Sequence, residues 1–181
     1  VWKDVDLSGL TLRRCKLVGL VASAVSARSS CWTEVLLRDV QFHHLTAQHL
    51  DVTRGHWTRC TMRSCAFPQC QLRHLTVTHT HAFACTCDSS QFGNVEFKAS
   101  ALTKCNLVGC SMRFSRWSGV NLHKTRMPHS TWDNVHITRC HWSDCGVQNS
   151  RFLTCVWDQC TLDHVMLTQG EFFENQWSST G

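Results

Sequence analysis

The sequence predicts an all-β solenoid in which the chain turns a corner every five residues and completes a square coil every 20. Two observations lead to this fold. All eight Trp occupy positions of the form 5k+2, and eleven of the thirteen Cys occupy multiples of five. Trp scattered at random over the five classes would do this with odds on the order of 10⁻⁵. The period of five is therefore a property of the fold.

The positions 5k+2 form the first inward class, because every residue of this class from Trp2 to Trp177 is apolar. Some members are small, such as Ala47 and Ala82. Residues one coil apart stack on the same side of a square coil. One side is then an internal column of Trp57, Val77, Phe97, Trp117, Ile137, Trp157 and Trp177. The next side carries Trp32, Phe92, Trp132, Phe152 and Phe172. Such columns bury large apolar areas and are expected to be core.

The multiples of five form the second inward class, which is small and rich in Cys. Cys65, Cys85 and Cys105 are expected to stack in successive coils. A disulfide needs Cβ atoms about 3.8 Å apart, closer than the strand spacing of about 4.8 Å, and Cys on adjacent sides do not face one another as zinc ligands do. We therefore favour packing thiols over redox, metal or disulfide roles. So many free thiols indicate a reducing compartment, and the outward Cys31 is the thiol expected to react first.

A period of five excludes a helix, with 3.6 residues per turn, and a flat strand, with a period of two. Four five-residue sides make one coil, and coils at strand spacing pair their backbones with the coils on either side. The register does not slip from Val5 to Trp177. About nine coils would form a rod on the order of 40 Å long. We expect residues 1–181 to form one such domain.

Several stretches resemble the pentapeptide-repeat family, whose consensus is A-(D/N)-L-x-x. The matching stretches are VDLSG (5–9), CKLVG (15–19), CNLVG (105–109) and VNLHK (120–124). The resemblance covers essentially the whole chain and implies a right-handed quadrilateral β-helix of about nine 20-residue coils, each of four pentapeptides. The chain departs from the family in having Cys, Val or Ser where Ala is usual, and many Trp or Phe where Leu is usual. The small inward residues are expected to compensate locally for this bulk.

Catalysis is not expected. The sequence contains no Gly-rich phosphate loop, no G-x-S-x-G, and no pair of acids that the coil would bring together in a cleft. A regular rod without inserted loops has no pocket to bury a substrate. The chain has twelve His, seven of them between His43 and His81, but the register disperses these seven over outward positions on several sides. Solvated surface is the favoured reading, with incidental metal affinity or pH sensitivity as the alternative. We expect no metal and no cofactor.

Charge is unevenly distributed along the rod. Residues 1–140 hold 17 Lys/Arg and 8 Asp/Glu, a net charge of +9, and residues 141–181 hold 1 and 5, a net charge of −4. One corner collects Arg13, Arg14, Arg54, Arg73 and Arg113, and the neighbouring side collects Arg38, Arg59, Lys98 and Arg139. These Arg stripes would attract an acidic partner. Plain solubility is the other reading.

Apolar residues in outward classes are the second surface anomaly. Leu153 and Phe173 are expected to stack on one side, with Val156 and Met166 on adjacent sides of the last two coils. Further cases are Phe83, in the stretch HAFACTC (81–87) that we expect to be the least regular coil, and Phe114. Exposed apolar patches mark contacts. The contact is another protein, a second copy, or part of a longer parent chain.

The sequence carries no apolar run near the roughly 20 residues of a membrane span. Its start, VWKDVDLSGL, lacks the basic stretch and apolar core of a signal peptide. The first residue is Val1 rather than Met, which is compatible with a segment of a longer protein. The resemblance implies a bacterial cytoplasmic protein, or a secreted effector if the chain is part of something longer.

Three functions are weighed. The favoured one is a non-catalytic scaffold or adaptor that binds another protein and self-associates through its C-terminal end. The resemblance adds the repeat tail of a secretion-associated or effector protein. An alternative is a DNA-gyrase-binding protein like the family's quinolone-resistance members, which resemble duplex DNA in shape and acidic surface; the net charge of +5 disfavours it. The third is binding of nucleic acid or another anionic surface through the Arg stripes, disfavoured because the Trp point inward and leave no aromatics for base stacking.

Overall fold

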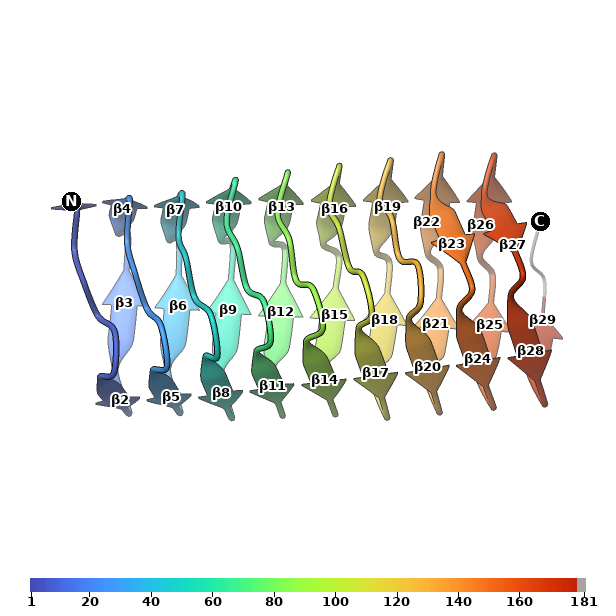
Figure 1. The fold of residues 1–181 in the computed structure, drawn as a ribbon, viewed down its shortest axis with the longest axis horizontal. Helices are drawn as coiled ribbons and strands as arrows, with labels where there is room; N and C mark the ends of the chain where they lie inside the picture. The colour runs from blue at the N-terminus through green and yellow to red at the C-terminus, as the bar shows by residue number, and fades with distance from the viewer. Residues whose placement is uncertain (179–181) are drawn as a thin grey trace.

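The computed structural model describes residues 1–178 and confirms the all-β solenoid of about nine coils (Figure 1). Every strand pairs in parallel with the strands one coil before and after it. Three sides of the coil carry nine-stranded sheets that run along the rod, and the fourth carries one two-stranded sheet. The part of the chain that is described contains no helix that could cross a membrane.

The strands are two or three residues long and belong to the four sides of the coil. The first side consists of β1 (Trp2–Lys3), β4 (Val21–Ser23), β7 (Gln41–His43), β10 (Thr61–Arg63), β13 (His81–Phe83), β16 (Ala101–Thr103), β19 (Asn121–His123), β22 (His141–Ser143) and β26 (Thr161–Asp163). The second side consists of β2 (Thr11–Arg13), β5 (Cys31–Thr33), β8 (Asp51–Thr53), β11 (Gln71–Arg73), β14 (Gln91–Gly93), β17 (Ser111–Arg113), β20 (Thr131–Asp133), β24 (Arg151–Leu153) and β28 (Glu171–Phe173). The third side consists of β3 (Lys16–Val18), β6 (Leu36–Arg38), β9 (His56–Thr58), β12 (Thr76–Thr78), β15 (Glu96–Lys98), β18 (Arg116–Ser118), β21 (His136–Thr138), β25 (Val156–Asp158) and β29 (Gln176–Ser178). The fourth side contains β23 (Gly146–Gln148) and β27 (Met166–Thr168).

The strand register is one full coil throughout, as in the pairing of Trp57 with Val77 and of Phe97 with Trp117. Two backbone hydrogen bonds recur at each corner. The N–H at a 5k+4 position donates to a carbonyl of the next coil, and the N–H at a 5k+1 position donates to a carbonyl of the coil before. Arg59 N to Thr78 O, at 3.0 Å, and Thr61 N to Val40 O, at 2.9 Å, are examples. These bonds satisfy the backbone groups that a corner would otherwise leave unpaired.

The corners lie at the 5k+4 positions, where the backbone adopts a left-handed conformation. Non-glycine residues there have φ between 44° and 57°, with Ala99 and Glu34 at the two limits, and glycines such as Gly9 reach 71°. Val and Ile are absent from these positions in the described chain, and Thr154 is the single β-branched residue among them. β-Branched residues are strained in this region of φ. The corner therefore constrains residue choice at an outward position.

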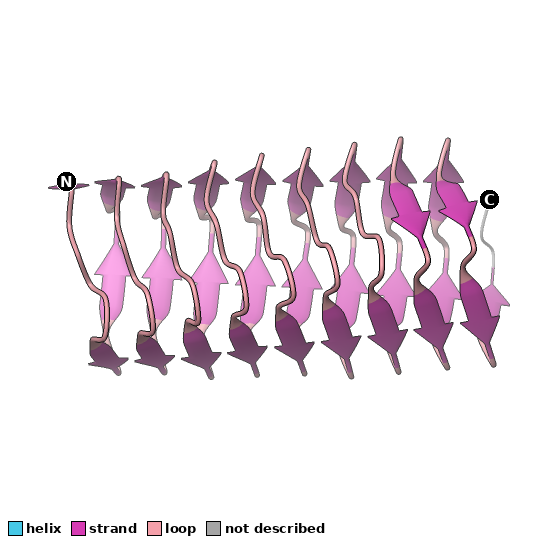
Figure 2. Ribbon diagram, in the orientation of Figure 1, coloured by secondary structure: helices cyan, strands magenta, loops and turns pink. Residues whose placement is uncertain are grey.

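The fourth side differs from the other three over most of the rod. Up to residue 130 it consists of isolated bridges followed by a turn, and only β23 and β27 near the C-terminal end are strands (Figure 2). Both prolines of the chain, Pro68 and Pro128, occupy the second position of this turn, directly before a residue with φ of 56°. Pro before a residue of positive φ suits a type II turn, and Pro is excluded from a central ladder strand.

The interior is one continuous apolar core built from the two inward classes. Aromatic rings stack along it, with ring centroids 4.5 Å apart for Phe97 and Trp117. The indole N–H groups of six Trp find no hydrogen-bond partner among the described residues, namely Trp32, Trp57, Trp117, Trp132, Trp142 and Trp157. An unsatisfied buried donor costs about 1–3 kcal/mol, whereas burying about 200 Å² of indole contributes about 5 kcal/mol. The apolar gain is the larger effect.

In some coils small inward residues make room for a large neighbour and fill the core. In another coil they leave space unfilled. Trp32 shares its coil with two small residues, Ala22 and Ala27, and all three are buried. The coil of residues 81–100 carries Ala82 and Cys87, and beside them an apolar cavity of about 60 Å³ remains. The expectation of an irregular coil at 81–87 is wrong for the backbone, because β13 pairs in full register on both sides. The irregularity lies in the packing.

The cavity makes a prediction about stability. Ala82→Val should fill part of it and raise the free energy of unfolding by about 1 kcal/mol, or the Tm by about 2–4 °C. The matched control is Ala47→Val, because Ala47 is equally an inward alanine but does not line the cavity. That change should overpack the core and destabilise it by about 1–3 kcal/mol. Thermal unfolding followed by circular dichroism measures both; equal effects of the two changes would contradict the account.

Candidate functional site

The predicted core columns lie inside the rod and are not available as a site along most of its length. Trp32, Trp117, Trp132 and Trp157 are each at most 1% exposed, and Trp57 and Phe97 are nearly buried. The exception is Trp177, which stacks on Trp157 with ring centroids 4.9 Å apart and planes inclined by 9°. Its other face has no coil over it among the described residues, so the side chain is 46% exposed.

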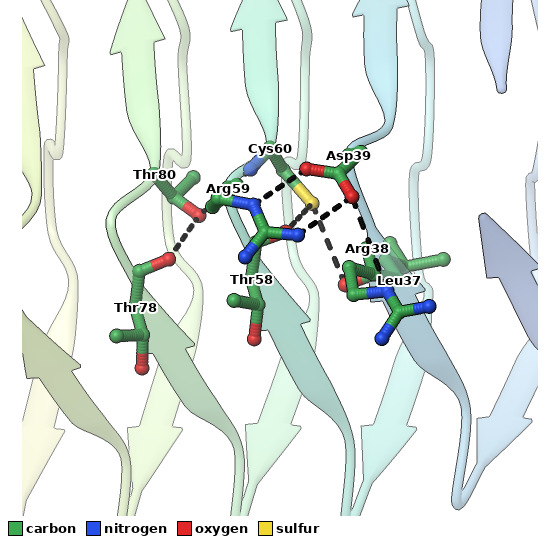
Figure 3. A network of polar contacts seen from close by, with 8 residues as sticks. All are labelled: Leu37, Arg38, Asp39, Thr58, Arg59, Cys60, Thr78 and Thr80. Carbon is green, nitrogen blue, oxygen red and sulfur yellow. Dashed lines mark hydrogen bonds and ion pairs between the residues drawn. The ribbon is translucent and has the colours of Figure 1, made fainter. Parts of the chain in front are cut away.

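The cysteine class has a clear structural reason, shown for Cys60 in Figure 3. Its Sγ lies 3.5 Å from Thr58 O and 3.7 Å from Leu37 O, a carbonyl of its own coil and one of the coil before. Where the class has Ser, the hydroxyl uses the same acceptors: Ser150 Oγ donates to Met127 O at 2.7 Å. The position therefore needs a small side chain that donates weakly and packs well, and both Cys and Ser meet that need.

All thirteen Cys are free thiols, ten of them buried. In the column of Cys65, Cys85 and Cys105, hydrogen bonds with Cys85 and burial raise the pKa of both Cys65 and Cys105. Burial alone raises the pKa of Cys70 to about 11. A buried thiol with a raised pKa forms little thiolate at neutral pH and is a poor nucleophile. Hydrogen bonds from neighbours in their columns lower the pKa of Cys85 and of Cys160. Both side chains are at most 3% exposed, so the buried cysteines, these two included, pack the core.

The histidines do not form a metal centre in the part of the chain that the structure describes. No group of three or more His, Cys, Asp or Glu side chains comes close enough there to hold an ion. The seven His from His43 to His81 sit at outward positions, half-buried or exposed.

The Arg stripes are interrupted by carboxylates one coil away. Glu34 bridges Arg14 and Arg54, at 2.9 Å and 3.1 Å. Asp39 accepts two hydrogen bonds from Arg59, at 2.6 Å and 2.8 Å (Figure 3). These hydrogen bonds hold the pKa of Glu34 and of Asp39 below their ordinary values. The stabilisation that both pairs add is therefore present above the ordinary carboxyl pKa and is lost as the pH falls through the lowered value.

Within the Arg stripes, Arg73 and Arg113 flank Gly93 on the second side of the coil. A surface hollow of about 360 Å³ lies there, lined in part by these three residues and Phe114. The φ of Gly93 is not positive, and an added Cβ would meet nothing closer than Arg73 Cγ at 3.9 Å. Neither backbone strain nor packing requires glycine at this position. Its effect is to leave space between the side chains of Arg73 and Arg113.

The predicted apolar contact residues fall on three sides of the last two coils. The structure pairs Leu153 with Phe173, across β24 and β28. Val156 is half-buried on the third side, and Met166 lies on the fourth, 59% exposed. Leu153 is half-buried and Phe173 is 61% exposed. Two of the four therefore meet, and the other two lie around the same end of the rod.

The sequence reasoning missed the inward residues of the last coil. Leu167, Phe172 and Trp177 belong to the buried class, yet they are 42%, 39% and 46% exposed. Phe172 stacks on Phe152 with centroids 4.8 Å apart, and its other face is uncovered within the described chain. Their position in the last coil of the repeat is the sequence feature that could have indicated this exposure. Together with Met166 and Phe173 they form an apolar surface, here called the C-terminal end.

Known proteins resemble this chain in structure and not in sequence. No protein-family model matches the chain, and no curated protein matches it in sequence. Solved structures do resemble it. HetL, a pentapeptide-repeat protein involved in heterocyst differentiation regulation from the cyanobacterium Nostoc, is 11% identical with a TM-score of 0.38, over 97% of this chain and 88% of that one. QnrB1, a plasmid-mediated fluoroquinolone resistance protein, is 13% identical with a TM-score of 0.46, over 93% and 91%.

A catalytic solenoid is also similar. The catalytic domain of a GH87 α-1,3-glucanase is 4% identical with a TM-score of 0.49, over 86% of this chain and 48% of that one. At sequence identities of this size, the similarity concerns the fold alone. The similar structures include an enzyme domain as well as pentapeptide-repeat proteins. Pentapeptide-repeat proteins are thus among the structural neighbours, and the chain shares their parallel β-solenoid.

The thiol environments make a testable prediction. At pH 8 the native protein should react quickly with a thiol-specific reagent only at Cys15 and Cys31. Cys87 is also half-buried, but burial raises its pKa well above the ordinary thiol value, so it should react slowly. The ten buried thiols should react only on unfolding, because burial shields their sulfur atoms from the reagent. Titration with Ellman's reagent, with and without denaturant, counts both groups. Cys31→Ser should lower the fast count by one; fast reaction of the buried thiols in the native state would contradict the structure.

Proposed function

We propose that residues 1–181 act as a non-catalytic scaffold that binds another protein through the C-terminal end. The observation that carries this is the exposure of Met166 and Phe173, two large apolar side chains at outward positions, beside the half-buried Leu153 that pairs with Phe173. Large aromatic and Met side chains are enriched in the buried centres of protein interfaces.

The charge around this surface supports a partner of basic character. Residues 161–178 contain three acidic residues, Asp163, Glu171 and Glu174, and no Lys or Arg. Arg151 pairs with Glu171 at 2.7 Å from the preceding coil, and His164 lies 2.8 Å from Asp163. In an interface of this kind, the apolar contacts at the centre would supply affinity. The acidic residues around them would select a basic partner. A bacterial adaptor, or the repeat tail of a secretion-associated or effector protein, is the biological role that the family resemblance favours.

A second candidate is binding of an anionic group through the Arg stripes. The hollow at Gly93 favours it, because glycine there has no structural cause and the space is lined by Arg73 and Arg113. Arginine pairs well with carboxylate and phosphate oxygens. The basic surface gives no support to the mimicry of duplex DNA that a gyrase-binding protein of the quinolone-resistance kind would need.

An affinity pull-down read by mass spectrometry tests the proposal, with purified DNA gyrase added as one candidate. Leu153→Asp/Phe173→Asp should abolish capture of the partner, because it places one carboxylate in the apolar surface and a second one directly beside it, at the residue that pairs with Phe173. The control Thr33→Asp/Thr53→Asp changes the same column of the second side far from the C-terminal end and should leave capture unchanged.

Salt separates the two candidates. Capture through the apolar end should persist between low and moderate salt, whereas contacts to phosphate groups should weaken by orders of magnitude over that range. A partner that is lost with salt and with Arg73→Glu/Arg113→Glu, but kept with Leu153→Asp/Phe173→Asp, would contradict docking at the C-terminal end.

A further inference from the structure

Two arginines placed two coils apart can hold one anionic group between them, and the chain shows this with a carboxylate of its own. Arg14 and Arg54 lie at the same corner, one coil before and one coil after Glu34. They approach its carboxylate to 2.9 Å and 3.1 Å. The hydrogen bond from Arg14, together with the charges of both arginines, lowers the pKa of Glu34. The spacing of the solenoid therefore lets two arginines share one anion.

The same spacing recurs on the second side of the coil with no carboxylate between the arginines. Arg73 of β11 pairs with Gly93 of β14, which pairs with Arg113 of β17 (Figure 1). The Cα atoms of the two arginines are two strand spacings apart, about 10 Å. Gly93 has no side chain to place between them. The middle position, which Glu34 fills in the first triplet, is open in the second.

We propose that the hollow at Gly93 binds a phosphate monoester carried on a planar ring, with Arg73 and Arg113 holding the phosphate group. This inference rests on the second candidate function above, because it names the anion that the Arg stripes would take. It does not depend on docking at the C-terminal end, which is a different surface.

The groups that line the hollow favour phosphate over carboxylate. Besides the two arginines they include the amides of Gln91 and Asn94 and the hydroxyl of Ser111, and none of the described residues that line it is Asp or Glu. A carboxylate has two oxygens, which a single guanidinium group can bind. A phosphate monoester has three terminal oxygens and a charge of about −1.5 to −2 at neutral pH. Two guanidinium groups with neutral donors beside them match that charge and number of acceptors.

The present contacts of the two arginines leave them available to such a ligand. Arg113 Nε lies 4.0 Å from Asp133 Oδ2, in the following coil, and its side chain is 64% exposed. Arg73 donates from Nη2 to the neutral amide oxygen of Gln71 on its own strand. Exposed contacts of this kind contribute little to stability. A doubly charged phosphate group at the hollow would therefore compete well for both side chains.

Phe114 provides a surface for the ring that carries the phosphate. It lies at the corner next to Arg113 and is 57% exposed. It lines both the hollow at Gly93 and a second hollow of about 500 Å³ around the corner, as do His74 and Asn94. A molecule with its phosphate at Gly93 can therefore extend past the phenyl ring into the second hollow. Aromatic rings pair favourably with one another, which favours a planar ring as the carrier.

Binding of phenyl phosphate to the ¹⁵N-labelled full chain, followed by amide chemical shifts, tests the site. The shift changes should centre on Gly93, Asn94 and Phe114 and should saturate. Gly93→Glu places a carboxylate between the arginines, as Glu34 does in the first triplet, and should weaken binding at least about tenfold. Circular dichroism checks that the variant folds.

Two controls separate occupation of the hollow from the change in charge. Ser118→Glu adds the same charge at an exposed position of β18 that lines neither hollow, and should change the affinity by less than about twofold. Gly93→Ala should bind like the wild type, because its Cβ would lie no closer than 3.9 Å to Arg73 Cγ. Equal weakening by Gly93→Glu and Ser118→Glu would overturn the site in favour of general attraction to a basic surface.

Three further ligands test the chemical class. Phenyl phosphate should bind about fivefold more tightly than glycerol 3-phosphate, and Phe114→Ser should remove that difference. Benzoate should bind more weakly than phenyl phosphate. Adenosine 5′-monophosphate tests the source of the group: tighter binding than phenyl phosphate indicates a nucleotide, and weaker binding indicates a phosphorylated tyrosine, both of which fit the proposal.

The remaining outcomes contradict it. Equal affinity for phenyl phosphate and glycerol 3-phosphate would overturn the role of Phe114, and benzoate bound as tightly as phenyl phosphate would assign a carboxylate ligand instead. The absence of saturable binding by every anion would overturn both this inference and the second candidate function. Docking at the C-terminal end would then still be decided by the pull-down with Leu153→Asp/Phe173→Asp, which leaves the hollow intact.

Discussion

The hydrogen bonding of each coil to the coils before and after it is the constraint on which the rest of the structure depends. It requires a corner every five residues, with the 5k+4 residue in the left-handed region and its N–H bonded to a carbonyl of the next coil. Once this register is set, every side chain has a fixed direction. A shift by one residue would turn the inward classes outward along all later coils, as a register slip does in any sheet.

Side-chain choice follows from that geometry, and most of it could be predicted from the sequence. The period of five alone identifies the two inward classes, the stacking of Trp57 under Val77 and the absence of a helix. The turns of the fourth side were not predicted, although Pro68 and Pro128 are separated by three whole coils and so lie on one side. A pattern of inward and outward residues does not distinguish a turn from a short strand, because both present the same classes to the core.

The candidate site could be predicted only in part, because periodicity places a residue and does not show whether a neighbour covers it. Leu153 and Phe173 were expected to meet because they are one coil apart, and they do. Phe172 and Trp177 were assigned to the core, since their class is buried in most earlier coils, and their exposure depends on being in the last coil described. The Arg stripes could be predicted from the register, but their ion pairs with carboxylates such as Glu34, one coil away on the same corner, depend on side-chain conformations that a repeat pattern does not contain.

Deleting residues 61–80 or 61–79 tests the register most directly, with urea unfolding followed by far-ultraviolet circular dichroism. The first deletion removes one whole coil, brings Trp57 under Phe97 and keeps both inward classes aligned. The shortened chain should therefore retain its β spectrum and a cooperative transition. The second deletion displaces every inward residue after the junction by one position and should abolish cooperative unfolding of that part. Similar unfolding curves for the two deletions would contradict the dependence of the fold on a register of whole coils.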